Sequence, residues 1–114
     1  MNFVTGIVRG GKLALPALGG RMIASDVTLP SEGAEVTVGL RPQDLRLTNG
    51  DTATLELREQ LGPVAYDHLI CADGAKIIVE TRGEDDWSEG SRVGLDFNDA
   101  DVLLFNAKTE ARLR

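Results

Sequence analysis

The chain has 114 residues and a formal charge of −6, from 12 Lys and Arg against 18 Asp and Glu. This length predicts one domain, and a composition of 42% hydrophobic and 26% charged residues excludes a wholly disordered chain. The acidic balance, with only three Phe, one Tyr and one Trp, argues against a nucleic acid partner. No apolar run approaches the ~20 residues that cross a bilayer. The single cysteine, Cys71, fits a reducing compartment.

The first motif in the chain lies at 6–13, which matches the P-loop spacing G-x-x-x-x-G-K through Lys12. Leu13 stands where a P-loop has the Ser or Thr that binds Mg²⁺. Pro16 breaks the segment where the phosphate-binding helix would continue. We therefore interpret the segment as a β-hairpin with its turn at Gly10-Gly11.

Strand signals dominate the rest of the chain. Apolar and polar residues alternate in 36–40, 53–58 and 92–97, as they do in half-buried strands. The continuous apolar runs 76–79 and 102–105 predict strands that are covered on both faces. In 53–58 the period of two predicts that Ala53, Leu55 and Leu57 face the core and that Thr54, Glu56 and Arg58 face solvent.

Four dipeptides between these segments predict tight turns: Gly10-Gly11, Gly19-Gly20, Asn49-Gly50 and Asp73-Gly74. No stretch shows a sustained period of 3.6 residues, and only 98–101 and the tail after Lys108 have room for a helical turn. The pattern predicts an all-β fold, a small β-barrel with tight hairpins and little or no helix. A composition boundary near 48–52 divides the single domain, 1–114, into two lobes of about 1–48 and 49–114.

Few residues suggest chemistry. His68 is the only histidine, and without a second His or a Cys pair it has too few companions for a zinc site. The acids around Asp96 and Asp99 lack the glycine and the glutamate of a calcium loop, so they predict a turn. The acidic segment with Asp85, Asp86 and Trp87 has two interpretations: a solvated connector with Trp87 against the barrel wall, or a protein interface.

One string is more specific than these motifs. Residues 38–45, V-G-L-R-P-Q-D-L, resemble the G-[IL]-R-P-E-x-[LI] signature in the C-terminal regulatory domains of ATP-binding subunits of sugar importers, the maltose and glycerol-phosphate type of ABC transporter. Three further matches follow the family's order. They are M-N-F-V-T-G at 1–6, E-Q-L-G at 59–62, and the closing pair G-L-D-F at 94–97 and L-F-N-A-K-T at 104–109.

The motif has a physical rationale in a β-barrel. Gly39 permits close packing of the backbone, Pro42 ends the pairing of a strand, and Arg41 can reach a carboxylate or a carbonyl. We therefore expect Gly39, Arg41 and Pro42 to act in the structure of the domain and in no catalysis.

The resemblance implies a transport-associated (TOBE) domain with an oligonucleotide/oligosaccharide-binding (OB) type of barrel. Such a domain is a non-catalytic regulatory and dimerisation unit, so this chain is expected to be no enzyme and to hold no cofactor. The ATPase domain, which would use ATP and Mg²⁺, is absent from this chain. The implied partners are a second copy of the domain, membrane permease subunits and, in some members, a cytoplasmic regulator. The implied location is the cytoplasmic side of the bacterial inner membrane, bound peripherally through the parent transporter.

A second function stays open. Related transport-associated barrels bind small oxyanions such as molybdate, and in this chain Lys12, Arg41 and several glycines are the candidates for such a site.

Overall fold

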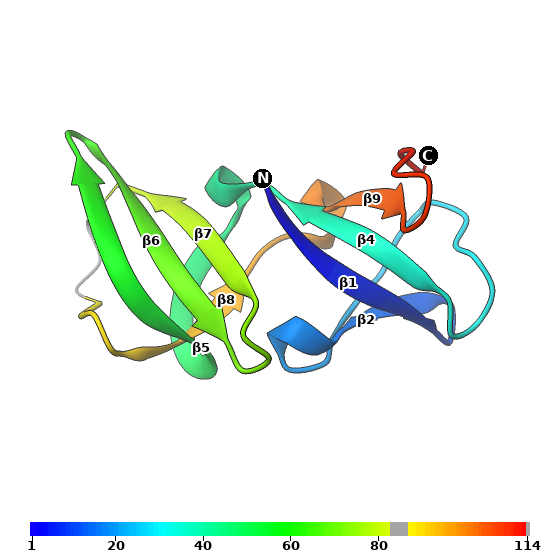
Figure 1. The fold of residues 1–114 in the computed structure, drawn as a ribbon, viewed down its shortest axis with the longest axis horizontal. Coiled ribbons are helices and arrows are strands. Elements are labelled where there is room, and N and C mark those ends of the chain that lie inside the picture. Colours follow the sequence, from blue (N-terminus) through cyan, green and yellow to red (C-terminus); the bar gives the residue numbers. More distant parts are fainter. Residues whose placement is uncertain (83–86, 114) are drawn as a thin grey trace.

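The computed structural model describes residues 1–82 and 87–113, and their strands form two antiparallel sheets (Figure 1). The first sheet has the strand order β3-β2-β1-β4-β9. No α-helix occurs in the described ranges, where the helical elements are three short 3-10 turns, η1 (Pro16–Leu18), η2 (Pro42–Asp44) and η3 (Asp99–Asp101). The prediction of an all-β, OB-like barrel in two lobes is confirmed. The strands of the first sheet are β1 (Asn2–Arg9), β2 (Lys12–Leu15), β3 (Arg21–Ile23), β4 (Glu35–Leu40) and β9 (Leu103–Asn106).

The second sheet has the order β7-β6-β5-β8 and lies beside the first in Figure 1. Its longest strand, β5, runs for 16 residues and bends as it passes from one neighbour to the other. The strands of this sheet are β5 (Arg46–Leu61), β6 (Val64–Cys71), β7 (Lys76–Thr81) and β8 (Arg92–Asp96). No helix of the described residues is long and apolar enough to cross a membrane.

Three of the four predicted turns are confirmed. Gly10-Gly11 joins β1 to β2, Gly19-Gly20 leads from η1 into β3, and Asp73-Gly74 joins β6 to β7. The turn at Asn49-Gly50 was wrong, because these residues lie inside β5, where the pairing with β8 is irregular between Thr48 and Ala53. A Cβ on Gly50 would come within 2.8 Å of the Cα of Gly94, so glycine permits a close approach of two strands here.

The division into lobes differs from the predicted one. The boundary at 48/49 falls inside β5, and the closing strand β9 pairs with β4, with Val38 opposite Leu104. The first sheet therefore combines 2–40 with 103–106, and the second uses 46–96. A local change in composition did not reveal this pairing, because β4 and β9 are distant in the sequence and meet only in the folded chain.

The predicted direction of side chains is confirmed for 36–40 and 92–97, but it is wrong at Leu57 and Arg58. The register of β5 against β6 shifts between Leu55 and Leu57, so Glu56 is an extra residue at a bulge. One added residue reverses every later side chain on the strand. Leu57 is consequently 46% exposed, and Arg58 turns inward toward Asp67.

The runs 76–79 and 102–105 were predicted to be covered on both faces, and the structure shows alternation instead. In β7, Ile77 and Val79 are buried while Ile78 is half-buried. In β9, Leu104 is buried between half-buried neighbours. An apolar run does not show whether its second face is covered, because this depends on which segments pack over it.

Candidate functional site

The end of β4 carries the family motif, and Gly39 lies on its outward side. A Cβ at Gly39 would be 2.8 Å from Sδ of Met1 and 3.0 Å from Cε2 of Phe105. The rings of Phe3 and Phe105 meet edge to face with centroids 5.9 Å apart. The missing side chain of Gly39 thus leaves room for a sulfur and an aromatic ring on the outer face of the first sheet.

Arg41 and Pro42 turn the chain out of β4. Pro42 begins the 3-10 turn η2, and Nε of Arg41 donates to Oδ2 of Asp44 at 2.6 Å. The carboxylate that Arg41 reaches is therefore one within its own motif. The geometry gives Arg41 a local partner that holds the turn.

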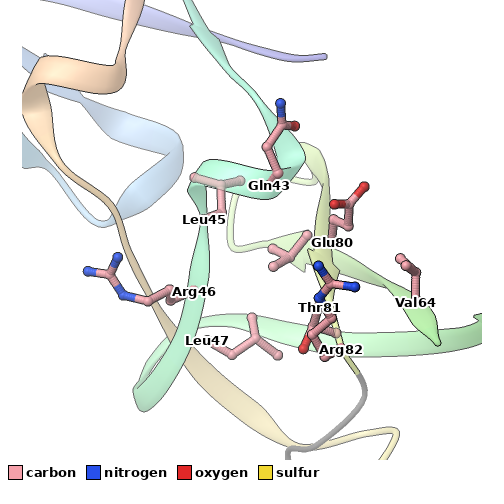
Figure 2. A pocket seen from close by; sticks show the side chains of 9 residues that line it. Gln43, Leu45, Arg46, Leu47, Val64, Glu80, Thr81 and Arg82 are labelled. Carbon is pink, nitrogen blue, oxygen red and sulfur yellow. The ribbon is translucent and has the colours of Figure 1, made fainter.

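A shallow depression of about 420 Å³ lies where η2 approaches β7 (Figure 2). Its lining mixes one acid, Glu80, with Arg46 and Arg82, and Figure 2 shows Arg46 extending away from the other two. Glu80 also accepts a hydrogen bond from the Tyr66 hydroxyl at 3.2 Å, and this bond raises the pKa of Tyr66.

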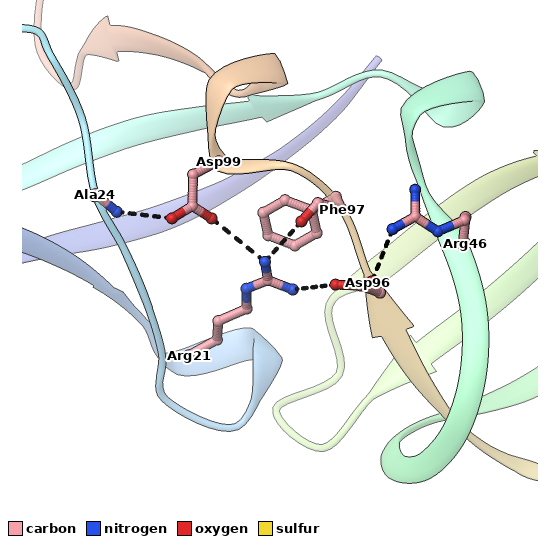
Figure 3. A network of polar contacts seen from close by, with 6 residues as sticks. All are labelled: Arg21, Ala24, Arg46, Asp96, Phe97 and Asp99. Atoms are coloured by element: carbon pink, nitrogen blue, oxygen red, sulfur yellow. Dashed lines mark hydrogen bonds and ion pairs between the residues drawn. The ribbon is translucent and has the colours of Figure 1, made fainter.

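A polar network joins the two sheets at the end of β8 (Figure 3). Arg21 of β3 donates from Nη1 to Oδ1 of Asp96 at 3.2 Å, and from Nη2 to the carbonyl of Phe97 at 2.7 Å and to Oδ1 of Asp99 at 3.3 Å. Its guanidinium also lies 3.8 Å from the centre of the Phe97 ring, within cation–π range. Arg46 of β5 reaches the other oxygen of Asp96 at 2.7 Å. One carboxylate thus receives an arginine from each sheet.

This network accounts for the acids around Asp96 and Asp99. The hydrogen bond from Arg46, followed by those from the Phe97 backbone and Arg21, lowers the pKa of Asp96. Asp99 also accepts from the backbone N–H of Ala24 at 3.1 Å. The turn predicted near 98–101 is the 3-10 turn η3. Among the described residues no group of His, Cys, Asp and Glu could hold a metal ion.

A second joint is the side chain of Asn2. Its Nδ2 donates to the carbonyls of Leu40 at 3.2 Å and Ile78 at 2.8 Å, and its Oδ1 accepts from the N–H of Ile78 at 2.8 Å. The amide group thereby pairs with the backbone of β7 as a neighbouring strand would. The sequence pattern did not single out Asn2, although a polar residue at an inward position of an alternating strand was a signal for it.

The second sheet also buries a charge pair. Asp67 of β6 is fully buried, and Arg58 binds both of its oxygens, from Nε at 2.6 Å and from Nη2 at 2.8 Å. The backbone N–H of Arg58 donates to Glu89 at 3.1 Å. This bidentate pair is structural in character, since Arg58 supplies a charged partner to both oxygens of a carboxylate that solvent does not reach.

The remaining sequence candidates lie apart from one another. His68 is on the strand surface beside Glu59, which contacts its Nε2. Cys71 is buried, and burial, with a smaller effect of Asp73, raises the pKa of its thiol. Trp87 is partly buried against the core, while Asp85 and Asp86 lie outside the described residues.

The P-loop-like segment forms the β1–β2 hairpin, in which Lys12 pairs with Arg9 at the end opposite Asn2. Arg41 follows Leu40, the residue paired with Asn2. Lys12 and Arg41 are therefore at opposite ends of β1, and the fold does not bring the two cations together.

Comparisons with known proteins agree with this geometry. A family model described as the TOBE domain matches residues 38–105. The sn-glycerol-3-phosphate import ATP-binding protein UgpC of Cereibacter sphaeroides is 30% identical over 110 residues, which cover 93% of this chain and 28% of that protein. A crystal structure of the cytoplasmic molybdate-binding protein ModG with molybdate bound superposes with a TM-score of 0.75. It covers 91% of this chain and 94% of the ModG chain at 18% identity, a likeness of fold alone.

Proposed function

This chain belongs to the TOBE domain family, and from that membership we propose that it is the non-catalytic regulatory and dimerisation domain of the ATP-binding subunit of an ABC-type sugar importer. The observation that carries the proposal is the 30% identity to UgpC over 93% of the chain. The chain spans about 28% of the length of that relative. The family motif at 38–45 lies within both comparisons and at the joint between the two sheets.

The site geometry is consistent with a non-catalytic role. The hairpin at Gly10-Gly11 has no helix N-terminus to hold phosphates. His68, Cys71 and the buried Asp67 belong to separate contacts, and the arrangement of each is structural. ATP and Mg²⁺ would therefore be bound by another part of a longer polypeptide, whose permease partners would place it at the cytoplasmic face of the inner membrane.

A direct test is the size of the native polypeptide. An antibody raised against the 114-residue chain should detect, in a lysate of the source cells, a band several times larger than 12.2 kDa. A band at 12.2 kDa would contradict the proposal. Titration calorimetry of the isolated chain with Mg·ATP supplies a second test, in which micromolar binding would overturn the non-catalytic assignment.

The second candidate function is the binding of a small oxyanion, favoured by the fold that this chain shares with ModG. Two features weigh against it: the net charge of −6, and the placement of Lys12 and Arg41 at opposite ends of β1. Thermal unfolding with millimolar molybdate, sulfate and phosphate discriminates the two proposals. A stabilisation by one anion alone would favour this second function.

A further inference from the structure

The outer face of the second sheet carries exposed apolar side chains, with the exposed acid Glu59 between Leu57 and Leu61. We define this face by Leu57, Leu61, Tyr66, His68 and Ile78. The register places Leu57, His68 and Ile78 opposite one another across β5, β6 and β7, so their side chains share one face. Leu57 is 46% exposed and Leu61 is 58% exposed. The bulge at Glu56 turns both leucines away from the core, and bulges of this kind re-aim side chains at functional surfaces.

This face continues onto the first sheet. The bonds between Asn2 and Ile78 hold β1 against the edge of β7. A depression of about 370 Å³ at this junction has Met1, Phe3, His68 and Ile78 among its lining residues. Met1 is 54% exposed and Phe3 is 57% exposed. The depression therefore lies between two exposed apolar residues of the first sheet, Met1 and Phe3, and the half-buried Ile78 of the second. Leu57 and Leu61 lie on the same outer face as Ile78, outside this lining.

The charges along β7 have an order that a partner with the reverse order would complement. Lys76, Ile78 and Glu80 alternate onto the outer face, with a cation at one end of the strand and an anion at the other. Lys76 is exposed and makes no ion pair within 1–82 or 87–113, and Glu80 has its Oε1 in contact with Tyr66. A two-fold rotation about an axis near Ile78 reverses this order, so each Lys76 would face Glu80 of the second molecule.

We propose that this face binds the same face of a second copy of the chain, with the two β7 strands antiparallel and Lys76 of each copy opposite Glu80 of the other. The proposal rests on the dimerisation role proposed above and assigns it a surface. Leu57, Ile78 and Phe3 form the apolar centre, and the reciprocal Lys76–Glu80 pairs lie at the rim, as interfaces are usually built. A partner of a single charge sign would match only one end of the strand.

The first experiment measures the dissociation constant of the 114-residue chain by sedimentation equilibrium. We expect a reversible dimer that Leu57→Glu weakens by about 100-fold or more, because the substitution places a charge in the apolar centre. Leu61→Glu is the second variant, for the case in which Leu57→Glu does not fold. Met22→Glu is the matched control, because Met22 is 45% exposed but lies on β3 of the first sheet. A monomer at every concentration, or a dimer broken equally by Met22→Glu, would overturn the proposal.

The second experiment is a charge-reversal cycle. Lys76→Glu and Glu80→Lys should each weaken the dimer by about tenfold, because each creates two like-charge contacts. The double variant should return to within about threefold of the original dissociation constant, since it restores both pairs in reversed order. Tyr66→Phe controls for the lost hydrogen bond at Glu80 and should leave association unchanged.

Only a two-fold contact of β7 with itself predicts this rescue. A double variant that stays weak would overturn the proposed geometry. A face that binds a different protein would leave the chain a monomer in the first experiment. These outcomes are independent of the native polypeptide's size, so a failed dimer surface is distinguishable from a failed assignment to an importer.

Discussion

The two sheets differ in how closely they follow a simple alternating pattern. In the first, β1 alternates along its whole length, with Val4 and Val8 buried between outward residues. In the second, β5 has a bulge at Glu56 and an irregular register between Thr48 and Ala53. The bulge in β5 turns Arg58 inward, where it pairs with the buried Asp67 of β6, and leaves Leu57 exposed. The irregular strand thus supplies both the partner of the buried charge and the exposed leucine.

The largest predicted effect breaks the charge pair inside the second sheet. Arg58→Met removes the guanidinium and leaves the Asp67 carboxylate fully buried. We expect the free energy of unfolding in urea to fall by about 3–5 kcal/mol, because a buried charge loses its partner. Arg92→Met is the control, because Arg92 forms an ion pair with Asp51 at the surface. The Arg92 side chain is 52% exposed and the Asp51 side chain is 82% exposed. Arg92→Met should lower the free energy of unfolding by less than about 1 kcal/mol. Equal losses in Arg58→Met and Arg92→Met would contradict the expectation that the buried pair matters more.

The next prediction compares a tight glycine in each sheet. A Cβ at Gly94 would lie 2.5 Å from Oγ1 of Thr48 and 2.8 Å from the carbonyl oxygen of Asn49. A Cβ at Gly6 would meet a side-chain methyl of Val38 at 2.9 Å, which can move more easily than backbone. Gly94→Ala should therefore cost about 1–3 kcal/mol by urea unfolding, and Gly6→Ala should cost less. A larger loss for Gly6→Ala would show that the first sheet is the more tightly constrained one.

The coupling of the two sheets is tested at Asn2. Asn2→Ala leaves three backbone groups of Leu40 and Ile78 without the side chain that satisfies them. We expect a loss of about 1–2 kcal/mol by urea unfolding, since the edge of β7 can regain water at part of this joint. Hydrogen exchange should report faster opening at the N–H of Ile78. Unchanged protection there would show that Asn2 does not hold the sheets together.

The smallest effect concerns pH at the other joint. Hydrogen bonds, first from Arg46, hold the pKa of Asp96 below its reference value of 3.8. The stabilisation from this carboxylate is therefore complete above pH 3.8 and is lost as the pH falls through the lower pKa of the folded state. Asp96→Asn should lower the melting temperature at pH 6, and its deficit should shrink toward pH 2.5.

Asp26→Asn is the control for this pH series, because Asp26 is exposed and its carboxylate makes no ion pair within the described part of the chain. Its melting temperature should follow that of the unmodified chain at every pH. A deficit of Asp96→Asn that grows as the pH falls would reverse the sign of the predicted linkage.

Local pattern predicted the strands, and it did so best where the backbone is regular. Val36, Val38 and Leu40 are buried as their spacing indicated, and Asp73-Gly74 makes the expected hairpin. The motif at 38–45 also indicated the family, because it is a run of adjacent residues that needs no knowledge of distant contacts. The prediction that Leu57 faces the core was wrong because a bulge leaves no clear mark in the sequence. The prediction of a turn at Asn49-Gly50 was wrong because a glycine is also needed where two strands approach closely.

The sequence by itself determined the class of the molecule: an acidic, glycine-rich, all-β chain with a recognisable family motif. Only the tertiary structure decided that β9 closes the first sheet, that Asn2 and Arg21 join the two sheets, and that Leu57 and Ile78 share an open face. The physical reason is that side-chain direction follows from two-residue periodicity as long as the register holds. Pairing between distant strands, and the bulge that shifts their register, depend on contacts that neighbouring residues do not specify.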